Sequence, residues 1–390
     1  MTSLRTYPSS RLQFSRGVSL VELMIAMVLG LLVTAGAIGI FLASNQTYRA
    51  TQNLSQIQES ARAAFELMAR DVREAGGSPC ERNLPIANAL NGGTNWWASF
   101  GQPVIGFDGN VAMPGAADLA DGTGGGNFGT GAGQRVEGTQ AIQLKSAMSN
   151  NVTVADHQPT SADMKLNTAN HGLRDGDIAM VCDFRQVGIF QISNVQPGVN
   201  DNLVHNTGGT ISPGNSTRDL GTGTDGTPTA YAYGCATGVR GQNCPSPDTR
   251  KCKDNSQTDA QSLDPVTGSC RPWSATVAKI TSSRWYIGNS MTLRPDGTRG
   301  RSLFRVGATN SGGSIVQQRQ EIATDVESLT LAFLPDRATS YQSAASITDW
   351  DAISAVRITL ALSSPEAVGT DDTRLQRSIE HVVTLRNRIP

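Results

Sequence analysis

The pattern of hydrophobic and polar positions divides the first 75 residues into two parts of one predicted helix. Val18 to Ala43 is an apolar run of 26 residues whose only charge is Glu22, and about 20 apolar residues are enough for a helix to span a bilayer. From Asn45 the chain is polar but keeps a helical period. Its apolar residues recur at steps of three or four, at Leu54, Ile57, Ala61, Phe65, Met68 and Val72.

The second part of the predicted helix is amphipathic. Charged residues occupy its other faces, namely Glu59, Arg62, Glu66, Arg70, Asp71, Arg73 and Glu74. The pair Gly76-Gly77 predicts a stop, so a helix from Val18 to Ala75 would be about 87 Å long. We expect residues 18–43 to lie in a membrane or a fibre core, and residues 44–75 to pack their apolar stripe on a head. A coiled-coil stalk fits less well, because the pattern lasts barely three heptads.

After Gly77 the pattern changes to short candidate strands and long loops, over a head of residues 76–390. Several candidates alternate apolar and polar residues, which is typical of half-buried strands. A turn is predicted at 294–297, and surface loops at 115–138 and 198–226. The predicted strands are Gln140–Ser146, Ile178–Cys182, Gly188–Val195, Ala275–Ile280, Ser283–Ile287, Ser302–Val306, Ser328–Leu334, Ile353–Leu362 and Ile379–Arg386. We therefore expect an α+β fold, with an antiparallel β-sheet head packed on the long helix.

Residues 1–17 are basic, with three arginines and no acidic residue. Basic flanks tend to stay cytoplasmic, so the bulk of the chain should cross the membrane. A secretory signal peptide has a shorter apolar core and a small-residue cleavage site, and this run has no clear site of that kind. A plain signal anchor is an alternative, but it gives Glu22 no role although a carboxylate in a bilayer is costly.

The start of the apolar run resembles a type IV prepilin, because a basic leader ends in Gly17 and VSLVELMIAMVLGLL follows. The resemblance implies a class III-like processing site. Prepilin peptidase would cleave after Gly17 and methylate the new N-terminus at Val18, where the family most often has phenylalanine. Glu22 then stands at the fifth mature position. There its carboxylate can pair with the amine of a neighbouring subunit and set the register between subunits, since opposite charges attract strongly in a low dielectric and an unpaired buried charge is costly.

Further stretches of the chain are similar, in the same order, to PilW-type minor pilins of the type IV pilus. They are residues 173–183, 189–192, 302–305, 325–329, 355–358 and 383–388. Residues 198–272 carry little of this similarity and are interpreted as an insertion. The resemblance implies a minor pilin that primes pilus assembly with other minor pilins, sits at or near the pilus tip, and can help to display a tip adhesin.

The same resemblance implies partners and a location. Before assembly the subunit would span the inner membrane once, with its head in the periplasm, and would meet prepilin peptidase and the inner-membrane assembly platform. After assembly it would lie in an extracellular fibre with the major pilin and other minor pilins. Twitching motility, DNA uptake and cell adhesion are all open as uses of such a fibre.

Two other functional classes are open. A J-type pseudopilin of a type II secretion system would have the same N-terminus, although the large head favours a pilus. A membrane-anchored enzyme or solute-binding domain is the third class. Two G-x-G-x-x-G matches, at 124–129 and 221–226, neither follow a strand nor open a helix, and there is no P-loop, G-x-S-x-G or H-E-x-x-H motif. We therefore expect no enzyme and no cofactor.

The charge balance adds little to this picture. The chain has 32 basic and 33 acidic residues, a formal charge of -1, without a dense basic run, so we expect no nucleic-acid partner. Cleavage after Gly17 would remove three arginines and leave 29 basic and 33 acidic residues, a charge of -4.

An even number of cysteines in an exported chain suggests disulfides. The six are Cys80, Cys182, Cys235, Cys244, Cys252 and Cys270. Six cysteines allow 15 pairings. We favour a disulfide between Cys80 and Cys182, which would tie the end of the long helix to a head strand. The other four would staple a loop. A zinc site is disfavoured, because no C-x-x-C pair occurs.

The remaining polar and aromatic candidates have ordinary interpretations. The four histidines are scattered, and we expect surface or structural roles for His157, His171, His205 and His381. Asp118, Asp121 and Asn127 fit a solvated loop better than a calcium site. The pair Trp96-Trp97 is either an exposed contact patch or part of the core, and the core is favoured.

Overall fold

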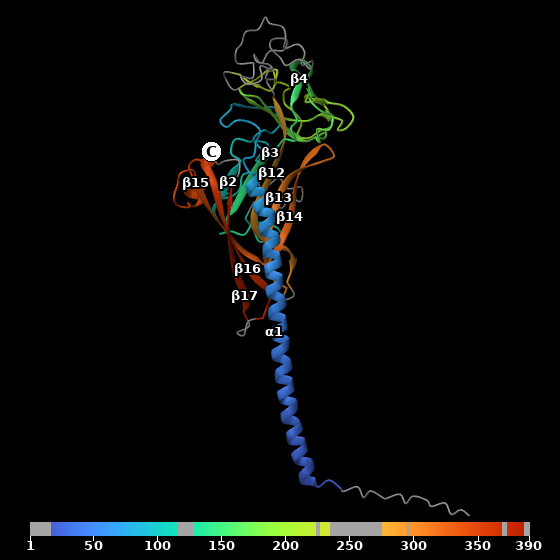
Figure 1. The fold of residues 1–390 in the computed structure, drawn as a ribbon, viewed down its shortest axis with the longest axis vertical. Coiled ribbons are helices and arrows are strands. Elements are labelled where there is room, and N and C mark those ends of the chain that lie inside the picture. The colour runs from blue at the N-terminus through green and yellow to red at the C-terminus, as the bar shows by residue number, and fades with distance from the viewer. Residues whose placement is uncertain are drawn as a thin grey trace, which may run out of the picture.

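A computed structural model describes residues 17–115, 128–223, 227–234, 275–294, 297–368 and 373–385. One long helix, α1 (Leu20–Glu74), is followed by a mostly β head, as Figure 1 shows. This is the predicted α+β, pilin-like fold. The helix has 55 residues and is about 82 Å long at about 1.5 Å per residue. It begins two residues after the predicted start and ends one residue before the predicted end.

The largest sheet has eight strands. They are β1 (Ile86–Asn88), β2 (Val104–Phe107), β3 (Ala141–Met148), β6 (Ile178–Cys182), β7 (Val187–Gln191), β12 (Thr276–Leu293), β13 (Arg299–Ser311) and β14 (Ser314–Thr324). The order is β1-β7-β6-β12-β13-β14, and β3, which pairs with β2, also pairs with β12. All neighbours are antiparallel except β1 and β7.

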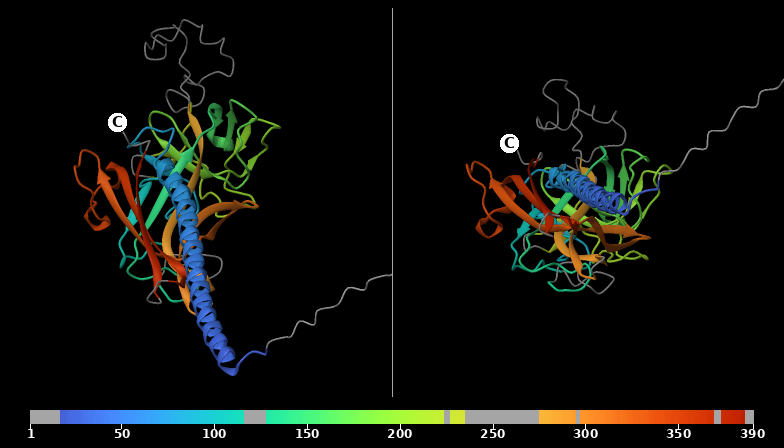
Figure 2. Two further views of the ribbon diagram at one scale, coloured as in Figure 1. Left: turned by 60° about the horizontal axis from the view of Figure 1, so that its bottom comes forward. Right: turned by 90° about the horizontal axis from the view of Figure 1, so that it is seen from below.

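A second sheet has three antiparallel strands, β15 (Val326–Pro335), β16 (Ile353–Ala367) and β17 (Arg374–Thr384). Strands β16 and β17 run alongside α1 (Figure 1). Figure 2 shows α1 lying between this sheet and the strands β12–β14 of the larger sheet. The main core therefore forms where the upper half of α1 meets both sheets.

Short strands build the end of the head that is farthest from the start of α1 (Figure 1). One sheet joins β4 (Val154–Gln158), β5 (Asp163–Leu166), β9 (Asn202–Val204) and β8 (Asn194–Val195), and another joins β10 (Gly221–Thr222) and β11 (Pro228–Thr229). Three short 3-10 segments, Pro159–Ser161, Ala344–Ser346 and Trp350–Ala352, complete the described elements.

Several predicted elements need correction. Strands predicted at 275–280 and 283–287 are one continuous strand, β12, and the strand predicted at 188–195 is divided between β7 and β8. The loop predicted at 198–226 includes β9 and β10, and its Leu203, His205 and Leu220 are buried. In the loop predicted at 115–138, Arg135 is buried because its guanidinium donates to backbone carbonyls.

Candidate functional site

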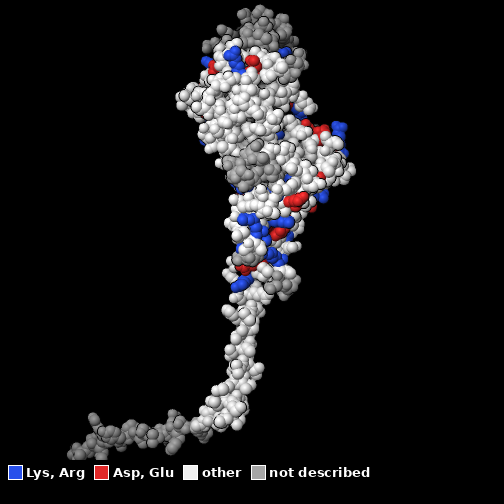
Figure 3. All heavy atoms as spheres, turned by 180° about the vertical axis from the view of Figure 1, so that it is seen from behind, with Lys and Arg blue, Asp and Glu red and all other residues white. Residues whose placement is uncertain are grey.

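The lower half of α1 is an apolar surface that no other described segment covers. Every residue from Gly17 to Arg49 is exposed, and the large side chains among them are Val18, Leu20, Val21, Leu23, Met24, Ile25, Met27, Val28, Leu29, Leu31, Leu32, Val33, Ile38, Ile40, Phe41, Leu42 and Tyr48. On the face seen in Figure 3, the stalk below the head carries no charged side chain, and charges gather where the head begins. An exposed apolar surface of this size marks a membrane or protein contact.

The first turn of α1 places the three residues that the sequence singled out. Gly17 and Val18 precede the helix and are exposed, and Ser19 is the N-cap. The Ser19 side chain accepts a hydrogen bond of 3.1 Å from the Glu22 backbone N–H. Glu22 is at position N3, so Ser19 to Glu22 has the S-x-x-E sequence of a capping box. Sequence reasoning missed this local role, although the spacing alone could have indicated it.

The Glu22 carboxylate is distinctive among the polar groups of this segment. Val18 to Ala43 contains only three polar side chains, Ser19, Glu22 and Thr34. Ser19 is engaged at the cap, and the Thr34 hydroxyl donates to the Gly30 carbonyl at 2.7 Å. Among the described residues, the Glu22 carboxylate makes no hydrogen bond and no ion pair. An acidic group in the first turn is favoured by the helix dipole, but in an apolar surrounding it needs a partner that the described residues do not supply.

The upper half of α1, in contrast, is buried against the head along one stripe. Its buried residues are Asn53, Ile57, Ala61, Ala64, Phe65, Met68, Ala69 and Val72. Five of the six predicted stripe residues are among them. The prediction for Leu54 is wrong, because this side chain is 37% exposed. Asn53 is buried in its place, and its amide donates to the Arg49 carbonyl within the helix.

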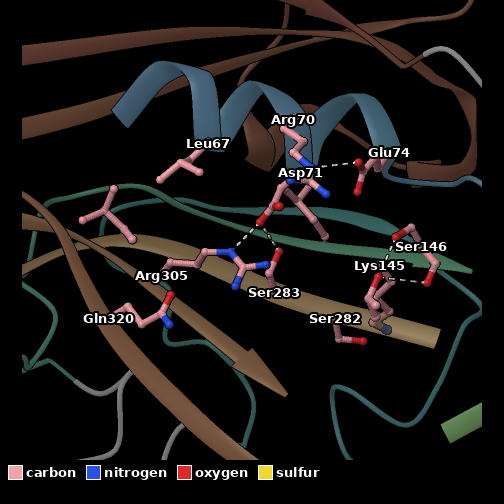
Figure 4. Close-up of a pocket in the computed structure, with 13 residues that line it drawn as sticks. Leu67, Arg70, Asp71, Glu74, Lys145, Ser146, Ser282, Ser283, Arg305 and Gln320 are labelled. Atoms are coloured by element: carbon pink, nitrogen blue, oxygen red, sulfur yellow. Dashed lines mark hydrogen bonds and ion pairs between the residues drawn. The ribbon is translucent and has the colours of Figure 1, made fainter. Parts of the chain in front are cut away.

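A carboxylate on the last turns of α1 fixes the helix on the sheet. One oxygen of Asp71, Oδ2, accepts hydrogen bonds from Ser283 Oγ at 2.9 Å, Trp285 Nε1 at 2.9 Å and Arg305 Nε at 2.7 Å. Figure 4 shows Asp71 pointing from the helix toward Ser283 and Arg305, in a groove of about 350 Å³. The sequence placed Asp71 on a face other than the stripe expected to pack on the head, so this contact is a correction. Its neighbour Arg70 pairs with Glu74 at 3.1 Å on the outer face.

The end of the helix is tied to the head covalently. After Glu74, Gly76 adopts a positive φ of 72°, a conformation that glycine permits at a helix C-terminus, and its N–H bonds to the Lys145 carbonyl of β3. Cys80 then forms a disulfide with Cys182 at the end of β6, with 5.7 Å between the Cα atoms. This predicted pairing is confirmed. Cys235, Cys244, Cys252 and Cys270 lie outside the described residues, as do Asp118, Asp121 and Asn127.

The tryptophan pair belongs to the core. Trp96 and Trp97 are buried, so the interpretation as a contact patch is wrong. The Trp96 indole N–H donates to Gln317, and the Arg284 guanidinium lies 4.0 Å from the ring centroid. These contacts hold the segment before β2 on the face of the large sheet opposite α1.

Two histidines that are distant in sequence meet inside the head. His157 and His205 are both buried, with 3.1 Å between their Nε2 atoms, and His157 Nδ1 accepts from the Tyr233 backbone N–H. Burial, followed by the repulsion of His205, lowers the pKa of His157 well below its ordinary value. Burial lowers the pKa of His205 to about 4. Both rings are therefore neutral near pH 7, and no cluster of three or more metal-ligating side chains occurs in the described ranges.

The comparisons with known proteins bear on the N-terminus alone. Residues 13–38 match the family model described as the prokaryotic N-terminal methylation motif. This match supports a type IV pilin-like prepilin with a pilin or pseudopilin role. A motif of this kind suggests a structural protein that is anchored in a membrane, processed by prepilin peptidase and assembled with other pilins. No curated protein and no solved structure matches the chain.

Proposed function

We propose that this chain is a PilW-type minor pilin, which primes assembly of a type IV pilus with other minor pilins and sits at or near the tip. The observation that carries the proposal is the exposed apolar half of α1, with one carboxylate in its first turn that has no partner among the described residues. Such a surface needs lipid before assembly and other apolar helices afterwards.

In this proposal the chain is processed and assembled in three steps. Prepilin peptidase cleaves after Gly17, which is exposed just before the helix, and Val18 becomes the methylated N-terminus. The helix then leaves the inner membrane for the fibre core, where Glu22 pairs with the amine of a neighbour. The head, held on α1 by Asp71 and the Cys80–Cys182 disulfide, contacts partner heads and can support a tip adhesin.

The processing step has a direct test. Mass spectrometry of the chain from membranes should find an N-terminus at Val18 carrying one methyl group, and Gly17→Val should leave the leader attached. A wild-type chain that still begins at Met1 would contradict the proposal and would favour a membrane-anchored binding or enzymatic domain.

The assembly role is tested by deleting the gene in a strain whose pili cannot retract. Surface pili are counted by electron microscopy, and the secreted proteins are profiled in parallel. Loss of pili with secretion intact is the expected result. Pili in normal number, with exoproteins trapped in the periplasm, would instead assign the chain to a type II secretion system as a J-type pseudopilin.

A further inference from the structure

Strand β17 is the outer strand of the three-stranded sheet and has one open edge. It pairs with β16 and packs a face on α1, where the His381 ring lies 4.6 Å from the Phe65 ring. Within the described part of the chain, no strand pairs with its other edge. An open edge presents unpaired backbone N–H and C=O groups to any strand that approaches it.

The hydrogen bonds show which groups point to this open edge. Leu385 N–H donates to the Ser354 carbonyl of β16 at 2.8 Å, and Ser363 N–H donates to Asp325 on the β15 side. Because bonding directions alternate along an antiparallel ladder, the odd-numbered residues of β17 bond to β16. The open edge therefore carries the backbone groups of Gln376, Ser378, Glu380, Val382 and Thr384.

This edge has few of the devices that prevent strand pairing. From Gln376 to Thr384 the register with β16 is unbroken and no proline occurs, over about 30 Å at about 3.3 Å per residue. Natural edges are protected by short length, bulges, proline or charges. Two charges are present, Arg377 and Glu380, and Glu380 already lies near Arg357, 3.8 Å away. Arg377 is exposed, so it favours a partner strand with an acidic side chain opposite it and disfavours one with a basic side chain there.

A second edge runs in the opposite direction on the other side of α1. Strand β14 pairs with β13, and among the described residues its far edge is bridged only at Ser314, by Ser212. Strand β14 ends at Thr324, just before Val326. Val326 is in register with Leu362, and Leu362 with Arg377, so the end of β14 lies near the level at which β17 begins. Strand β14 therefore descends toward the apolar half of α1 while β17 ascends (Figures 1 and 2).

Subunits whose α1 helices share one bundle all point the same way. Neighbours would then bring an ascending edge beside a descending edge, which is the geometry of antiparallel pairing. The sequences are compatible as well. When Thr324 is aligned with Arg374, Glu321 falls opposite Arg377, and Val316 falls opposite Val382. Opposite charges and β-branched pairs across strands are both favourable.

We propose that the β17 edge, from Gln376 to Thr384, binds a β14-like descending strand from the head of a neighbouring pilin-type subunit. The three-stranded sheet continues into the neighbour by main-chain hydrogen bonds, as in β-strand addition. This inference rests on the proposed function, since the fibre supplies the parallel orientation. The selectivity comes from an acidic side chain opposite Arg377.

The test uses the full-length chain in cells that assemble the fibre, with a photo-crosslinking residue at Val382, which is 53% exposed. Illumination should join it to a pilin-type subunit, and mass spectrometry should place the adduct in an edge strand. Ser378→Pro removes one outward N–H, so the adduct should fall about tenfold. Ser378→Ala keeps that N–H and should leave the adduct unchanged, and a crosslinker at Val199, at the far end of the head, should give none.

The control for folding is formation of the Cys80–Cys182 disulfide and protease resistance of the head. If Ser378→Pro fails this control, Arg377→Glu replaces it, because it changes no backbone group and should also reduce the adduct. A second copy of this chain as the crosslinked partner would support the proposal.

Two outcomes would overturn the proposal. One is an adduct that survives both variants, and the other is no adduct at Val382 although the chain is present in sheared fibres. The second outcome leaves the fibre role intact. Absence of the wild-type chain from sheared fibres would instead overturn the proposed function itself.

Discussion

The two halves of α1 form one continuous helix in two different surroundings. From Val18 to Ala43 every residue is exposed, and only Ser19, Glu22 and Thr34 among them have polar side chains. From Asn53 to Val72 one stripe is buried, and the charged residues lie on the other faces. Since both halves have the same backbone, the difference lies in their partners. The head supplies the partner of the upper half, whereas no described segment covers the lower half, which is available to lipid or other helices.

The polar groups show the same division. Asp71 in the upper half accepts three hydrogen bonds from the head, while the Glu22 carboxylate has no partner among the described residues. One carboxylate therefore stabilises the subunit, and the other is available for contacts between subunits.

The largest effect is expected at Glu22. Glu22→Gln keeps the capping-box sequence, which accepts Gln as well as Glu, but removes the charge. Either Glu22→Gln or Glu22→Ala would leave the amine of the neighbouring subunit buried without a partner, which costs about 3 kcal/mol. We therefore expect each variant to lower the amount of the chain in sheared fibres about 100-fold. Immunoblots of fibres and membranes measure this, and cleavage after Gly17 should continue. If Glu22→Gln assembles like the wild type, Glu22 serves only the helix cap.

A pair of methionine variants compares the two halves directly. Met68 is fully buried and Met24 is 59% exposed. Met68→Ala should lower the free energy of unfolding of the head by about 3 kcal/mol, since it leaves a cavity. Met24→Ala should not change it. Thermal unfolding of the full chain in detergent measures both. Equal losses would mean that the lower half also packs on the head.

Asp71 tests the contact that fixes the upper half. Asp71→Asn removes the charge that Arg305 pairs with, so we expect a loss of about 2 kcal/mol in the free energy of unfolding. The matched control is Arg70→Ala on the outer face, where the side chain is 71% exposed and such a pair contributes about 0.5 kcal/mol. An effect of Arg70→Ala as large as that of Asp71→Asn would contradict the assignment.

The hydrophobic pattern of the sequence predicted the bounds of elements that are set by neighbouring residues. The bounds of α1 follow from its apolar period and from Gly76-Gly77, and the strand Ile178–Cys182 has the predicted bounds because Asp177 and Asp183 flank an apolar run. Strand β14 was missed, because it is an edge strand whose half-exposed residues show no alternation. The half-exposed positions of this strand impose weak constraints on its sequence, so the period of two is lost.

Contacts between distant residues could not be predicted in the same way. Asp71 lies 234 positions from Arg305 in the sequence, and on the helix it stands among other charges. His157 and His205 are 48 positions apart, and no local pattern marks either as buried. In each case the tertiary fold selects the partner. The capping box at Ser19 differs, since its spacing is local.

A dependence on pH is expected in the head alone, and it separates the stability of the head from that of the helix contact. Tyr233 contacts His157, and Tyr231 and Asp183 are titratable groups beside Tyr233. Because the pKa of His205 is about 4 in the folded head and about 6.5 when unfolded, the unfolded chain binds more protons between these values. The contribution of neutral His205 to the free energy of unfolding is therefore complete above pH 6.5 and is lost as the pH falls toward 4.

At pH 5 the expected loss from His205 is about 2 kcal/mol, and His157 changes stability in the same direction. Urea unfolding at pH 7 and pH 5 measures the loss. His205→Gln cannot titrate, so its stability should depend less on pH even if it is lower throughout. An unchanged dependence in His205→Gln would place the acid sensitivity elsewhere in the head. The histidine pair is separate from the Asp71 contact, so acid should unfold the strands beside the pair first. Hydrogen exchange at pH 5 should therefore show faster exchange of the backbone amides in β4 and β9 than in the upper half of α1.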